Sequence, residues 1–235
     1  ADPNRLSRYG PIQGDPELRA GLLRRLRRLH GLDVSDLDVT VTPGANQAFA
    51  NLVTAVCDPG DSAVVVAPYY FSHIAALQLN GVDVVTTEFH RGTLLPTEEH
   101  LQAAMDQAKP RMLVITNPSN PTGAVWPPEL LRHVVKLCQR YGTWLVVDET
   151  YADFMHDGAV HTSPCGASWG YPRIAHVMSL SKIYGIPGWR VGVVAHPHSL
   201  TDNMRKVQDT MPTHAPVMSQ RLALLCLAEE ESRGW

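Results

Sequence analysis

The chain has 235 residues, a length that allows one large α/β unit or a domain and a half. Hydrophobic residues make up 44% of it and charged residues 18%, so a sizeable core can form and a wholly disordered chain is excluded. The net charge of −3 provides no basic surface of the kind that nucleic acid requires, so we expect no nucleic-acid partner.

The spacing of apolar residues alternates between periods of two and 3.6, which is typical of strands alternating with helices. It predicts helices over residues 15–30, 45–57, 71–79, 97–108 and 127–141. It predicts strands over residues 38–42, 62–67, 83–89, 111–116, 144–147, 174–179 and 191–195. Because these strands are largely apolar throughout, we predict an α/β fold with a mostly parallel seven-stranded sheet and helices on both faces.

Residues 199–230 are predicted to be helical, with a break at residues 211–216 and no further strand to pack against. The sequence contains no apolar run of the ~18 residues that a membrane helix needs, and residues 1–9 do not have the pattern of a signal peptide. We therefore expect no membrane association.

The four cysteines contain no Cys-x-x-Cys pair, which favours a reduced, cytoplasmic protein. The histidines form no metal-binding pattern, so we expect no metal site. His156, His161, His196 and His198 are interpreted as surface residues.

Polar residues gather where the predicted strands end, and ligands bind beyond the carboxyl ends of parallel strands. Lys182 follows the strand 174–179, where a buried amine with a lowered pKa could form a Schiff base with an aldehyde. A surface lysine on a loop is the alternative. Arg190 enters the last strand and could bind a phosphate, with Ser179 and Ser181 as further donors. Residues 44–46 begin a helix and could add backbone N–H groups to such an anion site.

Three other strand ends carry candidate ligand-binding side chains. The carboxylate of Asp148 could hold a ring nitrogen in its protonated form, or it could cap a following helix; Tyr151 could present its hydroxyl to the same ligand. Residues 117–123 contain Asn-Pro twice, which indicates a rigid turn with amide donors, whereas a plain turn would explain only one. Tyr70 could lie against a flat ring or could be a core tyrosine.

These segments, in this order, resemble the class I and II aminotransferases, fold type I enzymes that use pyridoxal 5′-phosphate (PLP). The resemblance covers nearly the whole chain and is carried by residues 9–19, 44–49, 68–70, 117–123, 148–151, 179–182 and 188–192. It implies an enzyme of class EC 2.6.1 that moves an amino group between an amino acid and a 2-oxo acid through a PLP–lysine Schiff base. It also implies a PLP-binding large domain over residues 1–198, with residues 199–235 beginning the interdomain helices.

The resemblance assigns roles to individual residues. Lys182 would form the Schiff base and transfer the proton, Asp148 would pair with the ring nitrogen, and Tyr70 would stack on the ring. Asn120 and Tyr151 would hold the ring hydroxyl. The phosphate would be bound by Gly44, Ala45, Asn46, Ser179, Ser181 and Arg190. Tyr9 is similar to a tyrosine that reaches the phosphate of the neighbouring subunit, which implies a homodimer with shared active sites.

Residues 68–71, 155–158, 206–209 and 219–222 are similar to the plant-type aromatic aminotransferases, which act on aromatic amino acids and methionine. Members of the family are longer, and we expect most of the small carboxyl-terminal domain to be missing here. The arginine that binds the substrate α-carboxylate belongs to that domain, so no residue of this chain is assigned to it. Two alternatives remain open: another fold type I reaction, such as that of a C–S lyase, a ring-forming lyase or a decarboxylase, and a truncated fragment without catalytic activity.

Overall fold

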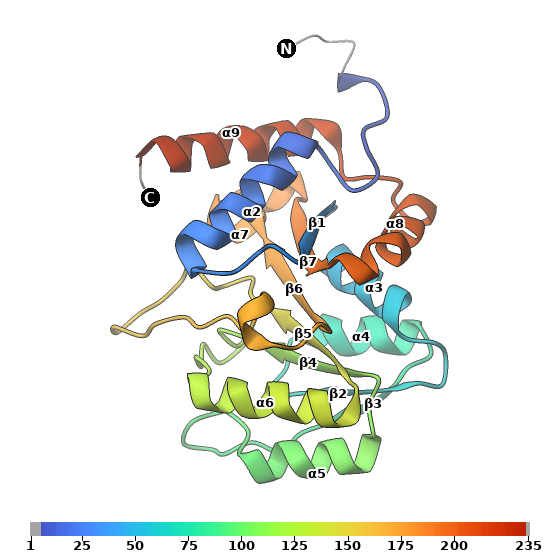
Figure 1. Cartoon of the computed structure of the whole chain (residues 1–235), viewed down its shortest axis with the longest axis vertical. Coiled ribbons are helices and arrows are strands. Elements are labelled where there is room, and N and C mark those ends of the chain that lie inside the picture. Colours follow the sequence, from blue (N-terminus) through green and yellow to red (C-terminus); the bar gives the residue numbers. More distant parts are fainter. Residues whose placement is uncertain (1–5, 234–235) are drawn as a thin grey trace.

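The computed structural model describes residues 6–233, which form one sheet with helices packed on both of its faces (Figure 1). The strands are β1 (Leu37–Thr42), β2 (Ser62–Val65), β3 (Asp83–Thr86), β4 (Met112–Thr116), β5 (Trp144–Asp148), β6 (Ile174–Ser179) and β7 (Gly192–Pro197). The helices are α2 (Pro16–His30), α3 (Ala45–Val56), α4 (Phe71–Leu79), α5 (Glu98–Ala108), α6 (Pro128–Tyr141), α7 (Leu180–Ile183), α8 (Thr201–Thr210) and α9 (Val217–Arg233). Short 3₁₀ turns are η1 (Ala167–Trp169), η2 (Pro187–Trp189) and η3 (His198–Leu200).

The seven strands lie in the order β1-β7-β6-β5-β4-β2-β3, and β7 alone among them runs antiparallel to both of its neighbours. All other pairs are parallel. The carboxyl ends of β1, β4, β5 and β6 therefore meet at one edge of the sheet, together with the amino end of β7. The predicted mostly parallel seven-stranded sheet is confirmed.

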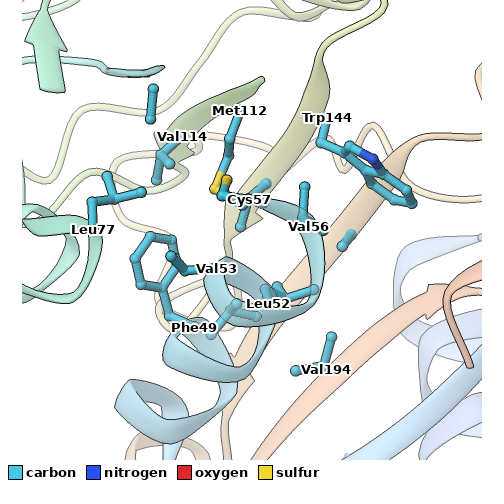
Figure 2. Close-up of a cluster of buried hydrophobic side chains, with 14 of the residues drawn as sticks. Phe49, Leu52, Val53, Val56, Cys57, Leu77, Met112, Val114, Trp144 and Val194 are labelled. Atoms are coloured by element: carbon cyan, nitrogen blue, oxygen red, sulfur yellow. The ribbon is translucent and has the colours of Figure 1, made fainter. Parts of the chain in front are cut away.

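One face of the sheet is covered by α3, α4 and α8. Phe49 and Leu52 of α3 and Leu77 of α4 pack there on alternate residues of the strands, such as Met112 and Val114 of β4 (Figure 2). Met204 brings α8 into the same cluster. The alternation follows from the two-residue period of a strand, which sends successive side chains to opposite faces.

The other face carries two groups of helices. Helices α5 and α6 cover the β2–β4–β5 part, where Leu101 and Leu131 pack on Leu145. Helices α2 and α9 cover the β1–β7 part. Gly21 of α2 lets these two helices approach closely, since a Cβ atom there would lie 2.5 Å from Cδ2 of Leu227.

Helices α8 and α9 are thus packed on the same sheet as the rest of the chain, and the break predicted between them is confirmed at residues 211–216. The division into residues 1–198 and 199–235 stays a prediction, and residues 1–5 and 234–235 lie outside the described part. None of the helices in residues 6–233 is long and apolar enough to span a bilayer.

The predicted segments 71–79 and 174–179 have the same bounds in the structure, whereas β2 and β3 are shorter than predicted. Strand β3 is an edge strand that pairs only with the four residues of β2, and it ends with them. Beyond the paired residues the backbone N–H of Thr87 still donates to the carbonyl of Val65 at 3.3 Å.

The interpretation of His196 as a surface residue is wrong. Strand β7 continues to Pro197, and this places the His196 ring in the interior, where its Nε2 lies 3.0 Å from Oγ1 of Thr40. Its neighbour His198 is exposed, as predicted.

We predict that Leu52→Ala lowers the free energy of unfolding by about 2–5 kcal/mol, because Leu52 is fully buried between α3 and the sheet and its removal leaves a cavity. Chemical denaturation measures the change. Leu79→Ala is the matched control, since this side chain is 87% exposed. Equal stability of the two variants would contradict the packing described here.

Candidate active site

A pocket of about 340 Å³ lies at the edge where the strand ends meet, a volume in the range of small-molecule sites. All the predicted site residues except Gly44 and Tyr9 line it. The lining residues are Ala45, Asn46, Tyr70, Asn120, Asp148, Thr150, Tyr151, Ser179, Ser181, Lys182, Pro187 and Arg190.

The carboxylate of the pocket is held by two fixed donors. Asp148 is 6% exposed at the end of β5. Its Oδ2 accepts a hydrogen bond from Nε2 of His73 at 3.0 Å, and its Oδ1 accepts one from the backbone N–H of Thr150 at 3.0 Å. A turn and not a helix follows β5, so the alternative that Asp148 caps a helix is wrong.

Sequence reasoning missed His73. It lies on α4, buried, with its ring 4.4 Å from the ring of Phe49. Tyr70, His73 and Leu77 follow the i, i+3, i+7 spacing of a helix face that packs inward, and a histidine on such a face was the available signal.

The opposite end of the pocket is an anion cradle built by α3 and the residues before β7. Gly44 precedes α3 with a φ of 87°, and α3 has no side-chain cap, so its first backbone N–H groups are open to a ligand. A Cβ atom on Gly44 would lie 2.3 Å from Nη2 of Arg190. Gly44 therefore makes room for the guanidinium beside the helix terminus.

Ser179, Ser181 and Lys182 come from the junction of β6 with α7. The Oγ of Ser181 is buried and has no hydrogen-bond partner in the described structure, although it lines the pocket. Such a buried hydroxyl is suited to a ligand. The Lys182 side chain is exposed rather than buried, because α7 carries it past the strand end to the open side of the pocket.

The remaining site residues surround the space between the carboxylate and the cradle. Tyr70 is half-buried, so the alternative of a core tyrosine is wrong, and its hydroxyl donates to Oδ1 of Asn46 at 3.5 Å. Asn120 and Tyr151 line the pocket from the ends of β4 and β5. Tyr9 does not join them: it is 88% exposed and contacts His214 edge-on at 5.8 Å.

A second buried carboxylate, Glu149, lies next to Asp148 and points to the other face of the sheet. Its Oε2 lies 2.6 Å from Nδ1 of His176 and 3.0 Å from Oγ of Ser163, and its Oε1 lies 3.2 Å from Nε2 of His161. The interpretation of His161 as a surface residue is thus wrong, because its side chain is buried beside the carboxylate of Glu149.

Charge pairing determines the protonation of this cluster. Burial by itself would raise the pKa of Glu149, but the charge of His176, its hydrogen bond and the nearby His161 outweigh it and lower the pKa. Burial opposes the protonation of His161, yet its contacts with Glu149 raise its pKa. No group of three His, Cys, Asp or Glu side chains in residues 6–233 is arranged to hold a metal ion.

The sheet and the pocket define an α/β protein that places an amine and a carboxylate beside an anion cradle. The family described as aminotransferase class I and II matches residues 1–233, and the chain belongs to this family.

Three relatives illustrate the similarity. The aromatic aminotransferase ISS1 of Arabidopsis thaliana is 42% identical over 98% of this chain and 58% of its own length. The structure of an aspartate aminotransferase from Thermus thermophilus with maleate superimposes with a TM-score of 0.89 at 31% identity, over 97% of this chain and 59% of that one. An aromatic aminotransferase from Pyrococcus horikoshii gives a TM-score of 0.90 at 28% identity, over 98% and 62%. The chain thus spans about 58% of the length of the Arabidopsis relative.

The pocket fits PLP, the cofactor of this family. The partnerless Ser181 hydroxyl, the guanidinium of Arg190 and the first turn of α3 supply donors for a phosphate. Asp148 would provide an anion for a protonated ring nitrogen, and Lys182 would provide an amine for the aldehyde.

We predict that Glu149→Gln lowers the free energy of unfolding at pH 7 by about 3–5 kcal/mol, because it leaves the buried histidines without their anion. The pKa of Glu149 is lower in the folded than in the unfolded protein, so its stabilisation is present above about pH 4.3 and is lost as the pH falls further. Urea denaturation from pH 7 to pH 3 measures both effects.

The variant is expected to lose stability less steeply than the parent below pH 4.3, since it has no carboxylate to protonate at this position. Glu88→Gln, at an exposed position, is the control. Parallel acid profiles of Glu149→Gln and the parent would contradict the ion-pair description.

Proposed function

We propose that the protein is a PLP-dependent aminotransferase that moves an amino group between an amino acid and a 2-oxo acid. The observation that carries the proposal is the single pocket in which Lys182, Asp148 and the anion cradle face one another. Membership of the class I and II family supports it. The residues of the described chain supply groups for every part of the cofactor.

When bound, PLP supplies an aldehyde and an electron sink for the substrate Cα. Arg190, Ser179, Ser181 and the start of α3 would hold its phosphate. Asp148, fixed by His73 and Thr150, would keep the ring nitrogen protonated. Tyr70 would provide an aromatic face for the ring, and Asn120 and Tyr151 would bind its hydroxyl.

Lys182 provides the covalent attachment and the proton transfer. With PLP bound, Nζ of Lys182 would be the group that attaches the cofactor, and the same amine would be the general base for the substrate Cα proton. Its position on the open side of the pocket leaves the amine accessible to both the cofactor and the substrate.

We also propose aromatic amino acids or methionine as amino donors. The Arabidopsis relative, 42% identical, is named an aromatic aminotransferase. A homodimer is proposed on the exposed Tyr9, which lies beside a hollow lined by Val217 and Met218 and is available to a neighbouring subunit. The cytoplasmic location stays a prediction.

We expect the purified protein to develop a visible absorption band with PLP, and borohydride to fix the cofactor permanently on Lys182. Peptide mass spectrometry locates the modified lysine. Adding phenylalanine should abolish the band and leave the aminated cofactor, pyridoxamine phosphate. Lys182→Ala should develop no band, whereas Lys136→Ala, on α6, is the control and should behave as the parent.

The outcomes separate the reactions. Release of ammonia and a 2-oxo acid without pyridoxamine phosphate would favour a lyase and contradict the proposal. A band that no amino acid changes would indicate a fragment without catalytic activity.

We predict that Asp148→Asn retains the band but slows the amino transfer by about 10²-fold or more, the scale on which a positioned acid–base group acts. A neutral amide no longer favours the protonated ring nitrogen, so the substrate Cα proton becomes less acidic. Single-turnover absorbance with phenylalanine measures the rate. A rate within twofold of the parent would refute the role of Asp148.

A further inference from the structure

Lys182 lies on a very short helix, so its position depends on contacts beyond the helix itself. Helix α7 has only four residues, Leu180–Ile183, and a helix of this length is not stable through its own hydrogen bonds. Leu180 is buried in the core and fixes the start of α7. The end that carries Lys182 requires a second fixed point.

The two sides of α7 border different hollows. Ser181 and Lys182 line the cofactor pocket. Ile183 and Tyr184 line a larger hollow of about 770 Å³ between α2, α9 and the turn after β5. The backbone N–H of Tyr184 donates to the carbonyl of Leu180 at 3.0 Å, so Tyr184 belongs to the same helical turn as Lys182. A contact that fixes the Tyr184 side chain therefore also fixes the backbone of Lys182.

A buried ion pair between α2 and α9 provides such a contact. The hydroxyl of Tyr184 donates to Oε2 of Glu230 on α9. Glu230 and Arg25 of α2 are each 4% exposed, and Nε of Arg25 lies 3.1 Å from Oε1 and 3.0 Å from Oε2 of Glu230. Arg28 adds a hydrogen bond of 3.1 Å to Oε1. The acceptor for Tyr184 is thus a charged oxygen held in place by two guanidinium groups, and hydrogen bonds to charged groups are the stronger ones.

The same guanidinium of Arg25 also reaches the turn after β5. Its Nη2 donates to Oδ1 of Asp153 at 2.8 Å, and Asp153 lies two residues after Tyr151. Arg25 therefore connects the segment that carries Lys182, through Glu230, with the segment that carries Tyr151.

The protonation of these donors agrees with the contacts. Burial and the hydrogen bond to Glu230 raise the pKa of Tyr184, so its hydroxyl keeps its proton at neutral pH. Burial opposes the charged form of Arg25, but Asp153 and Glu230 outweigh it and raise the pKa of Arg25.

Resting on the proposed aminotransferase function, we propose that Tyr184 and Glu230 are positioning residues for Lys182. The hydrogen bond between them, with Arg25 holding the carboxylate, fixes α7 so that Nζ of Lys182 can meet the aldehyde of the cofactor. Within the described chain neither Tyr184 nor Glu230 lines the cofactor pocket, so both act through the backbone of α7.

The test compares two forms of the cofactor on the full chain. PLP can attach to Lys182, whereas pyridoxamine phosphate carries an amine in place of the aldehyde and cannot. Tyr184→Phe keeps the ring and removes only the hydroxyl. It should raise the apparent Kd for PLP, measured from the visible band, about tenfold, the scale of one hydrogen bond to a charged group. The Kd for pyridoxamine phosphate, measured by calorimetry, should stay within twofold of the parent.

A matched control and a double variant sharpen the comparison. Tyr171→Phe removes a hydroxyl that donates to the carbonyls of Cys138 at 3.0 Å and Thr143 at 2.7 Å, away from the pocket, and should leave both Kd values within twofold. In the Glu230→Gln background, Tyr184→Phe should raise the Kd for PLP by no more than about threefold, because a neutral amide is a weaker acceptor than a carboxylate.

The results distinguish this inference from the proposed function. Equal weakening of PLP and pyridoxamine phosphate by Tyr184→Phe would indicate a general loosening of the fold and overturn the positioning role. An unchanged Kd for PLP, or the full tenfold loss in the Glu230→Gln background, would also overturn it. If phenylalanine fails to convert the band of the parent, the aminotransferase is refuted, while the two-cofactor comparison, which needs no turnover, still decides the role of Tyr184 and Glu230.

Discussion

The active site depends on one close approach between two backbones. A Cβ atom on Gly192 would lie 2.2 Å from the carbonyl carbon of Gly44, so the amino end of β7 and the start of α3 can touch only because residue 192 is a glycine. Gly44 in turn leaves room for the side chain of Arg190. This contact sets the guanidinium of Arg190 beside the uncapped helix terminus. It is possible because β7 is antiparallel, which brings the residue before that strand to the edge where the other strands end.

Two neighbouring carboxylates at the end of β5 bind partners on opposite faces of the sheet. The strand period sends Asp148 to the α4 face, where His73 binds it, and Glu149 to the opposite face, where His176 and His161 bind it. One carboxylate faces a ligand pocket, whereas the other is buried among paired groups. Adjacent residues of the same charge type thus have different tasks because their surroundings differ.

Much of the fold and of the site could be predicted from the sequence. Apolar runs are long enough to define each strand, and polar residues at the strand ends meet wherever the strands are parallel. The partners of buried polar groups could not be predicted. His73 is 75 residues from Asp148, and His161 and His176 are 12 and 27 residues from Glu149, so only the tertiary structure shows that they meet. The sequence left open whether Lys182 is buried or exposed, because the short α7 that carries it has too few residues to show an apolar period.

The pocket at the strand ends is bounded by two kinds of segment, which differ in how freely their side chains can change. The cradle is built from helix termini, glycines and strand ends, where a change of one side chain disturbs backbone packing. The turns at residues 118–123 and 151–156 combine buried positions, such as Ser119, with exposed ones, such as Phe154 and His156, which can change without moving the sheet. A single scaffold can therefore keep the backbone packing around the cradle while exposed side chains on its turns vary. Relatives named as aromatic and as aspartate aminotransferases share this fold at TM-scores near 0.9, which agrees with a fixed scaffold that carries variable side chains on its turns.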